Sequence, residues 1–244
     1  MNHQPLFNEL QTAQAQGQRL LAVLLDPDKA AHQDWSQLVV SLQQAKATHV
    51  FVGGSVVTAT CGPELIDFLH AHLHLPVVLF PGDPSQLYPN ADALLLLNLV
   101  SGRNPDYLIG MQVKAAPVLQ KAQFEIWPTG YILVDGGTQT TVQRVSKTQA
   151  MDPLNVEEIV HTALAAQFMG ANCVYLEAGS GALNPVPPAV IRQVREAISI
   201  PLLVGGGLRS RAAIEAAYQA GATLVVVGTA LENDLNFFAY DSVS

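Results

Sequence analysis

One acid follows a short apolar run and precedes a loop of small residues in the stretch 174-VYLEAGSGA-182. The apolar run, residues 174–176, is typical of a buried strand, and Glu177 ends it. A carboxylate at such a place can accept a proton or stabilise a developing positive charge. Tyr175 lies two residues before the acid, so we expect both side chains on one face of the strand.

Two more glycine-rich turns follow apolar runs later in the chain. They are 204-VGGGLRS-210 and 225-VVVGTALEND-234. Such turns leave backbone N–H groups open to an anion, and a helix that begins behind them adds a favourable dipole. The pattern predicts a phosphate site, with tight turns that bind nothing as the other interpretation.

An aspartate, Asp26, ends the first apolar run and precedes a proline. A carboxylate there can hold Mg²⁺, which prefers one or two carboxylates together with substrate phosphates. Ser55, after the second run, offers a hydroxyl to the same ion. Both residue types are also common helix N-caps, so the pattern leaves metal binding and capping open. Asp28 and Lys29 are interpreted as solvated residues at a helix start.

Apolar runs alternate with amphipathic segments, and this alternation must position the chemical residues. The runs cover residues 20–25, 49–52, 77–80, 93–97, 131–134, 173–176, 202–204 and 223–227. The helical patterns cover residues 33–46, 63–72, 106–121, 155–169, 187–198 and 209–220. Eight strand–crossover units in 244 residues predict an α/β fold, a single (β/α)₈ TIM barrel over residues 1–244, with an open doubly wound sheet as the competitor.

Two connections depart from the regular barrel pattern. The connector 81-PGDPSQLYPNAD-92 has too many helix breakers for a crossover helix, so the third helix should be missing or reduced. The polar stretch 135-DGGTQTTVQRVSKTQAMDP-153 is long for a connection, which predicts a lid or a substrate loop.

The composition excludes several classes of partner. With 12 basic and 20 acidic residues the net charge is −8, which argues against nucleic acid, because phosphate backbones need clustered Lys and Arg. No signal peptide pattern is visible, and no apolar run approaches the roughly 20 residues of a bilayer span, so we expect a cytoplasmic protein. The 49% apolar content permits a homo-oligomer, with Trp127, Phe237 and Phe238 in an interface or in the core.

Seven motifs carry a resemblance over about residues 20–233. They are LLDPDK (24–29), FVGGS (51–55), LFPGDPSQL (79–87), PTGYILVDGG (128–137), YLEAGSGA (175–182), VGGGLRS (204–210) and VVGTALE (226–232). Together they resemble the geranylgeranylglyceryl phosphate synthase family, which includes the PcrB proteins, and more closely its larger, archaeal-type branch.

The resemblance implies an enzyme that joins C1 of a polyprenyl diphosphate, such as geranylgeranyl diphosphate, to the 3-hydroxyl of sn-glycerol 1-phosphate, giving an ether lipid precursor and pyrophosphate. It implies Mg²⁺ bound by Asp26 and Ser55, and catalytic roles for Glu177 and Tyr175. The glycerol phosphate residues that it implies are Tyr175, Leu176, Glu177, Ala178, Gly179, Ser180, Gly181, Gly206, Gly207, Gly228 and Thr229.

A gap left by the third helix would give the prenyl tail an apolar groove, with Tyr88 and residues 94–97 as neighbours. Two rival functions stay open. A phosphate-binding isomerase or cyclase of amino-acid biosynthesis would use Asp26 with an acid such as Asp135. A phosphometabolite-binding barrel would act as a sensor and catalyse nothing.

Overall fold

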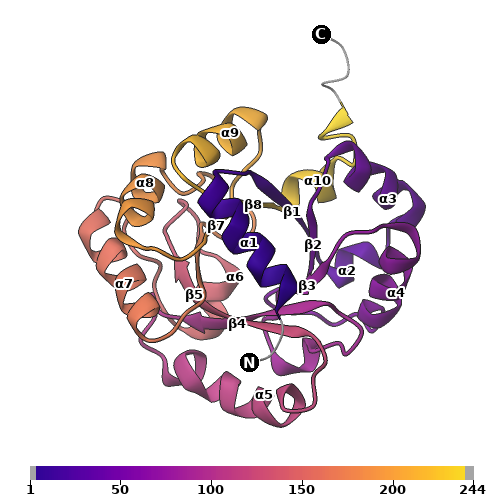
Figure 1. Ribbon diagram of the computed structural model, residues 1–244, viewed down its shortest axis with the longest axis horizontal. Coiled ribbons are helices and arrows are strands. Elements are labelled where there is room, and N and C mark those ends of the chain that lie inside the picture. The colour runs from indigo at the N-terminus through magenta and orange to yellow at the C-terminus, as the bar shows by residue number, and fades with distance from the viewer. Residues whose placement is uncertain (1–3, 240–244) are drawn as a thin grey trace.

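The strands pair in sequence order, and β1 closes the ring by pairing with β8 (Figure 1). The computed structural model describes residues 4–239. Its strands are β1 (Leu20–Leu25), β2 (His49–Val52), β3 (Val77–Leu79), β4 (Ala93–Leu99), β5 (Glu125–Leu133), β6 (Cys173–Glu177), β7 (Leu202–Gly205) and β8 (Leu224–Val227). The pairing is parallel throughout. The predicted barrel is confirmed, and a closed ring excludes the open sheet.

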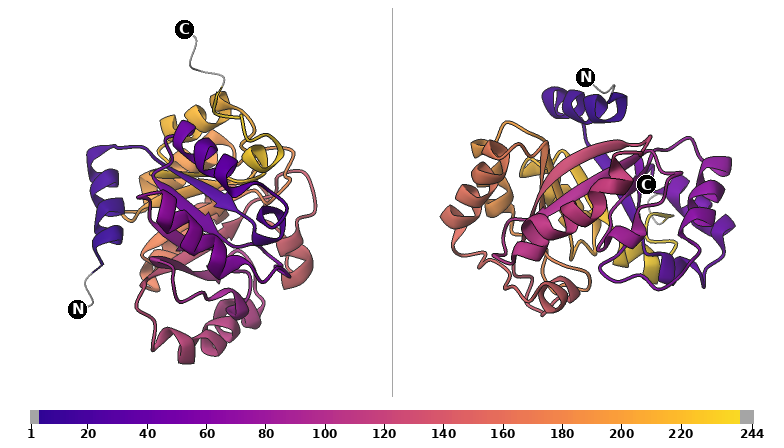
Figure 2. Two further views of the ribbon diagram at one scale, coloured as in Figure 1. Left: turned by 90° about the vertical axis from the view of Figure 1, so that its right-hand side faces the viewer. Right: turned by 90° about the horizontal axis from the view of Figure 1, so that it is seen from below.

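Helices surround the ring and cover its outer face (Figures 1 and 2). They are α1 (Pro5–Gln16), α2 (Pro27–Ala30), α3 (Trp35–Gln44), α4 (Gly62–His72), α5 (Met111–Leu119), α6 (Thr141–Ser146), α7 (Val156–Phe168), α8 (Pro188–Ala197), α9 (Arg211–Gln219) and α10 (Thr229–Asn233), with the π-helical turn η2 (Asp106–Gly110) before α5. All six predicted helical segments contain a helix. Between β3 and β4 there is only a 3₁₀ turn, η1 (Pro84–Gln86), which confirms the reduced third helix.

The first helix closes the end of the barrel opposite to the carboxyl ends of the strands (Figure 2). Glu125, at the start of β5, accepts hydrogen bonds from the backbone N–H groups of Leu6 and Phe7 at 2.8 and 2.9 Å. Trp127 donates its ring N–H to the same carboxylate at 2.9 Å. The sequence pattern predicted neither α1 nor the first six residues of β5, because Glu125 and Pro128 interrupt the apolar run.

Two layers of apolar side chains hold the barrel together. Alternate residues of each strand face the interior, where Trp127 is fully buried, and the others face the helices. Trp127 therefore belongs to the core and to no interface. Phe238 is also buried, and its ring packs perpendicular to that of Phe237. The homo-oligomer stays a prediction.

Within residues 4–239, no helix combines the length and the apolar character that crossing a membrane requires.

Candidate active site

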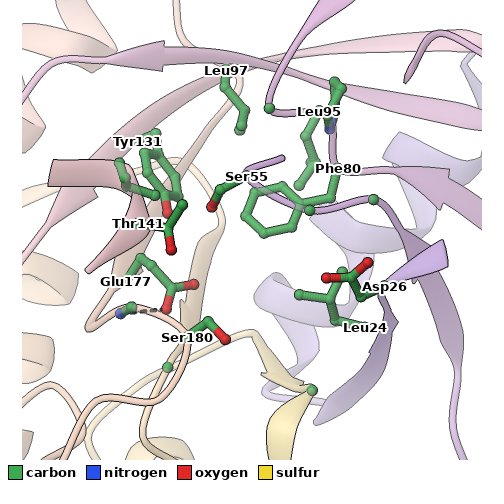
Figure 3. Close-up of a pocket in the computed structure, with 18 of the residues that line it drawn as sticks. Leu24, Asp26, Ser55, Phe80, Leu95, Leu97, Tyr131, Thr141, Glu177 and Ser180 are labelled. Atoms are coloured by element: carbon green, nitrogen blue, oxygen red, sulfur yellow. Dashed lines mark hydrogen bonds between the residues drawn. The ribbon is translucent and has the colours of Figure 1, made fainter. Parts of the chain in front are cut away.

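A cavity of about 440 Å³ opens at the carboxyl ends of the strands (Figure 3). It is the place where barrels of this kind position reactive groups. The predicted site residues that line it are Asp26, Ser55, Tyr175, Glu177, Gly179, Ser180, Gly181, Gly206, Gly207, Gly228 and Thr229. The fold thus brings these residues, up to 203 positions apart in the chain, around one space.

Two of the predicted residues do not reach this space with their side chains. Leu176 and Ala178 pack in the layer between the strands and the helices. The cause is the alternation of a strand, which turns Leu176 outward when Tyr175 and Glu177 face inward. Neither residue lines the cavity, and the Ala178 N–H already donates to the Gly205 carbonyl at 3.1 Å.

Glu177 presents a buried carboxylate to the cavity. The residue is 6% exposed. Burial raises its pKa from the ordinary 4.5 to about 7, against the opposing effects of the Gly179 N–H and the Tyr175 hydroxyl. The Gly179 N–H donates to Oε1 at 2.6 Å, so the loop after the strand fixes the carboxylate. A pKa near neutrality suits a group that exchanges a proton at physiological pH.

Gly206 lets the loop after β7 pass directly beside that carboxylate. Its φ of +80° favours glycine, and a Cβ atom there would collide with Glu177 Oε1 and lie 2.6 Å from the Gly179 N. The position therefore needs glycine for two independent reasons, its backbone conformation and the space occupied by the acid.

Tyr175 lies beneath the acid, within a group of aromatic rings. Its ring stacks on Phe80 with 5.2 Å between centroids and meets the edge of Tyr131 at 5.5 Å. The hydroxyl is buried next to Glu177, yet it has no hydrogen-bond partner of normal geometry anywhere in residues 4–239. A buried hydroxyl without a partner costs stability, so a polar group of a ligand is its natural complement.

The glycine turns form an open anion cradle beside Glu177. Across residues 4–239, no acceptor is found for the backbone N–H groups of Gly206 and Gly207. Ser180 and Thr229 approach each other, with 3.4 Å between their hydroxyl oxygens. Arg209 donates to the Gly181 carbonyl at 2.9 Å. Unpaired N–H groups next to hydroxyls and an arginine make this side suitable for a phosphate.

Asp26 and Ser55, in the loops after β1 and β2, both line the cavity. Figure 3 shows Asp26 and Glu177 on opposite walls, with the Phe80 ring between them in that view. Asp26 caps α2, since its Oδ1 accepts the Asp28 N–H at 3.0 Å. Burial, and to a lesser degree the charge of Glu232, raises the Asp26 pKa. Of the two alternatives, capping holds for Asp26, which leaves its second oxygen for a cation, and is wrong for Ser55, because Cys61 is the N-cap of the next helix, α4.

The donor set fits a magnesium ion only in combination with a ligand. Carboxylate and hydroxyl oxygens are the hard donors that Mg²⁺ prefers. Within the described part of the chain, however, no three His, Cys, Asp or Glu side chains gather in a way that could hold a metal. Phosphate oxygens of a substrate would have to complete the coordination of an ion at Asp26 and Ser55.

A buried glutamine that the sequence analysis missed positions the Ser55 loop. Gln86, on η1, accepts from the N–H groups of Gly54 and Gly82, both at 3.3 Å, and donates to the Gly54 carbonyl at 3.0 Å. The short turn in place of the third helix thus ties together the loops after β2 and β3. The motif LFPGDPSQL contained this residue, but only its prolines were interpreted.

Part of the polar stretch after β5 forms the short helix α6 beside the cavity. Thr140 and Gln143 form a capping box that starts α6, and Thr141, Val142 and Arg144 line the cavity. These residues border the cavity, and the role of the stretch as a lid or a substrate loop stays a prediction. Asp135, in the same stretch, is exposed, accepts the Gly137 N–H at 2.8 Å and lies outside the lining. The structure therefore does not pair Asp135 with Asp26.

The cavity continues out of the barrel mouth along β4. Leu95 belongs to the barrel interior and Leu94 to the layer under the helices, yet both line the cavity. Met111 and Ala115 of α5 bound its far side. The reduced third helix leaves this apolar passage open. Tyr88 packs instead over Gly62 and does not line the cavity, so its predicted place beside the groove was wrong.

A glycine pair tests whether Gly206 makes room for the acid. Gly206→Ala should lower the free energy of unfolding by roughly 3 kcal/mol, because the alanine would have a left-handed backbone and its Cβ would collide with Glu177. Gly170→Ala has the same kind of backbone strain at φ +94° but no atom within 4 Å of the new Cβ, and should cost about 1–2 kcal/mol. Urea unfolding measures both. Equal losses would contradict the close packing of Gly206 on the carboxylate.

Comparisons with known proteins agree with this geometry. The PcrB family matches residues 14–243. The chain is 49% identical over 233 residues to a geranylgeranylglyceryl phosphate synthase of Flavobacterium johnsoniae, with 96% of each chain covered. It is 51% identical over 215 residues to the enzyme of the same name from Zunongwangia profunda, with 88% of this chain and 92% of the other covered.

A solved structure extends the similarity to three dimensions. The (S)-3-O-geranylgeranylglyceryl phosphate synthase of Thermoplasma acidophilum, in complex with its substrate sn-glycerol-1-phosphate, has a TM-score of 0.88 and 32% sequence identity. The match covers 97% of this chain and 95% of that one. The resemblance carried by the seven motifs is confirmed, and the chain belongs to the PcrB family of enzymes.

Proposed function

We propose that this protein transfers a geranylgeranyl or similar polyprenyl group from its diphosphate to the 3-hydroxyl of sn-glycerol 1-phosphate. The observation that carries the proposal is the buried Glu177 carboxylate, placed between a backbone anion cradle and the Asp26 wall. The names of the similar enzymes and the bound substrate of the Thermoplasma relative support the same reaction.

The acceptor binds on the glycine side in this proposal. Its phosphate accepts from the free N–H groups of Gly206 and Gly207, with Ser180 and Thr229 at the edge of the cradle. Because the cradle adjoins Glu177, a glycerol held there places a hydroxyl against the carboxylate. The Tyr175 hydroxyl, which lacks a partner within residues 4–239, is positioned to orient that group.

The chemical step forms one bond and breaks one. The acceptor oxygen attacks C1 of the prenyl group, and the C1–O bond to the diphosphate breaks with its electron pair leaving on pyrophosphate. The proton of the attacking hydroxyl goes to Glu177, whose pKa of about 7 matches that task. The neighbouring negative charge also stabilises positive charge that develops at the allylic carbon.

The donor binds on the other side, with its tail in the apolar passage. Mg²⁺ bound by Asp26, Ser55 and diphosphate oxygens would neutralise charge on the leaving group. The tail would follow β4 past Leu94 and Leu95 toward α5, through the gap at η1. A narrow apolar passage of this kind accommodates a polyprenyl chain by excluding water from both surfaces.

Removing the proton acceptor tests the proposed reaction. Glu177→Gln should lower the Mg²⁺-dependent release of pyrophosphate from geranylgeranyl diphosphate by about 10²–10⁴-fold, as is typical for loss of a general base. The wild-type rate should rise as the pH passes through about 7, since the deprotonated carboxylate accepts the proton.

Glu158→Gln, an exposed change on α7, is the matched control and should leave the rate unchanged. Wild-type protein that binds a ribosyl phosphate and turns over no prenyl substrate would indicate an isomerase or cyclase. Phosphate binding with no turnover of either kind of substrate would indicate a sensor.

A series of donors tests the passage along β4. Prenyl diphosphates of increasing length should react faster as more of the tail fills the apolar lining, because each buried CH₂ contributes about 0.8 kcal/mol. Labelled sn-glycerol 1-phosphate serves as the common acceptor, and kcat/KM is compared across the series. Equal values at every length would show that the passage does not hold the tail.

A further inference from the structure

An ion pair between two helices borders the cavity on the Asp26 side. Lys29 of α2 and Glu232 of α10 are joined by 2.5 Å between Nζ and Oε2, and both line the cavity. The Glu232 side chain is only 7% exposed, whereas that of Lys29 is 46% exposed. The carboxylate is thus a fixed anchor and the ammonium its more accessible partner.

The fold gives Lys29 a fixed place relative to Asp26. The Lys29 N–H donates to the Asp26 carbonyl at 3.0 Å in the first turn of α2. The charges of Glu232 and Lys29 both act on Asp26, after the larger effect of burial. The three charged groups therefore form one cluster on the wall opposite to Glu177.

The cationic side chains of the lining are few, and they lie in different places. In the described residues that line the cavity they are Lys29, Arg144 and Arg209. Arg209 is joined to the loop after β6, and Arg144 projects from α6. Lys29 is therefore the ammonium that accompanies Asp26, where two carboxylates would otherwise repel an anion.

We infer that Lys29 binds the diphosphate of the prenyl donor, and that Glu232 is a positioning residue that holds the ammonium at the cavity wall. The inference rests on the proposed function and adds to it a residue for the leaving group. Across the cavity, the phosphate of the acceptor substrate has backbone N–H groups and Arg209 to bind it. On the side of the prenyl diphosphate the wall carries carboxylates, which repel a diphosphate unless cations lie between them.

Substitution at Lys29 tests this assignment with two measurements. Lys29→Met should raise the KM for geranylgeranyl diphosphate about tenfold and leave the KM for sn-glycerol 1-phosphate within about twofold. Calorimetry with inorganic pyrophosphate, without divalent ions, should show a similar loss of affinity. Lys29→Arg should restore most of the KM for geranylgeranyl diphosphate and most of the affinity for pyrophosphate, because it keeps the positive charge.

Two further variants separate binding from folding. Lys29→Met with Glu232→Gln removes both charges, so no buried carboxylate is left unpaired, and should still bind pyrophosphate weakly. Lys121→Met, an exposed change after α5, should match the wild type in all measurements.

The outcomes also separate this inference from the proposed function. Prenyl transfer by the wild type, with donor KM and pyrophosphate affinity unchanged in Lys29→Met, would overturn the assignment of Lys29 alone. A raised KM for sn-glycerol 1-phosphate in its place would assign Lys29 to the acceptor and likewise overturn it. A wild type that transfers no prenyl group would overturn the proposed function itself.

Discussion

The site depends on a carboxylate that is buried with one strong hydrogen bond. Taking Glu177 out of water disfavours its charged form, and the Gly179 N–H offsets only part of that cost. The folded protein therefore binds this proton more tightly than the unfolded chain. The resulting stability is fully present below about pH 4.5 and is lost as the pH rises through about 7. At neutral pH the buried Glu177 therefore contributes less to the stability of the fold, while its raised pKa suits it to accept a proton.

Residues from several strands and loops of the barrel surround Glu177 and form the wall opposite to it. Gly206 brings the loop after β7 against it, and Tyr175 fills the space beneath. On the opposite wall, Gln86 ties the Ser55 loop to the turn that replaces the third helix. The same replacement opens the apolar passage along β4. In the proposed reaction, the missing third helix therefore has two effects: the turn that replaces it holds the Ser55 loop in place, and the space that it leaves admits the prenyl tail.

Much of this arrangement was predictable because parallel strands buried on both faces have a simple pattern. Apolar runs located all the strands, and the residues that follow them included Asp26 and Glu177. Prolines between β3 and β4 revealed the reduced helix. The sequence pattern did not predict features that depend on tertiary contacts. Gln86 is buried by tertiary bonds that no spacing indicates, and Lys29 meets a residue 203 positions away. The short helix α6 was concealed by its polar composition.

A titration of Glu177 decides whether this carboxylate can serve as the proton acceptor near neutral pH. Glutamate labelled with ¹³C at the carboxyl carbon can be titrated by NMR, with Glu177→Gln used to assign the signal. We expect a midpoint of about 7 in the folded protein, because burial disfavours the charged carboxylate. A midpoint near the ordinary 4.5 would mean that the carboxylate is solvated and fully charged at neutral pH, and would contradict its role as the proton acceptor.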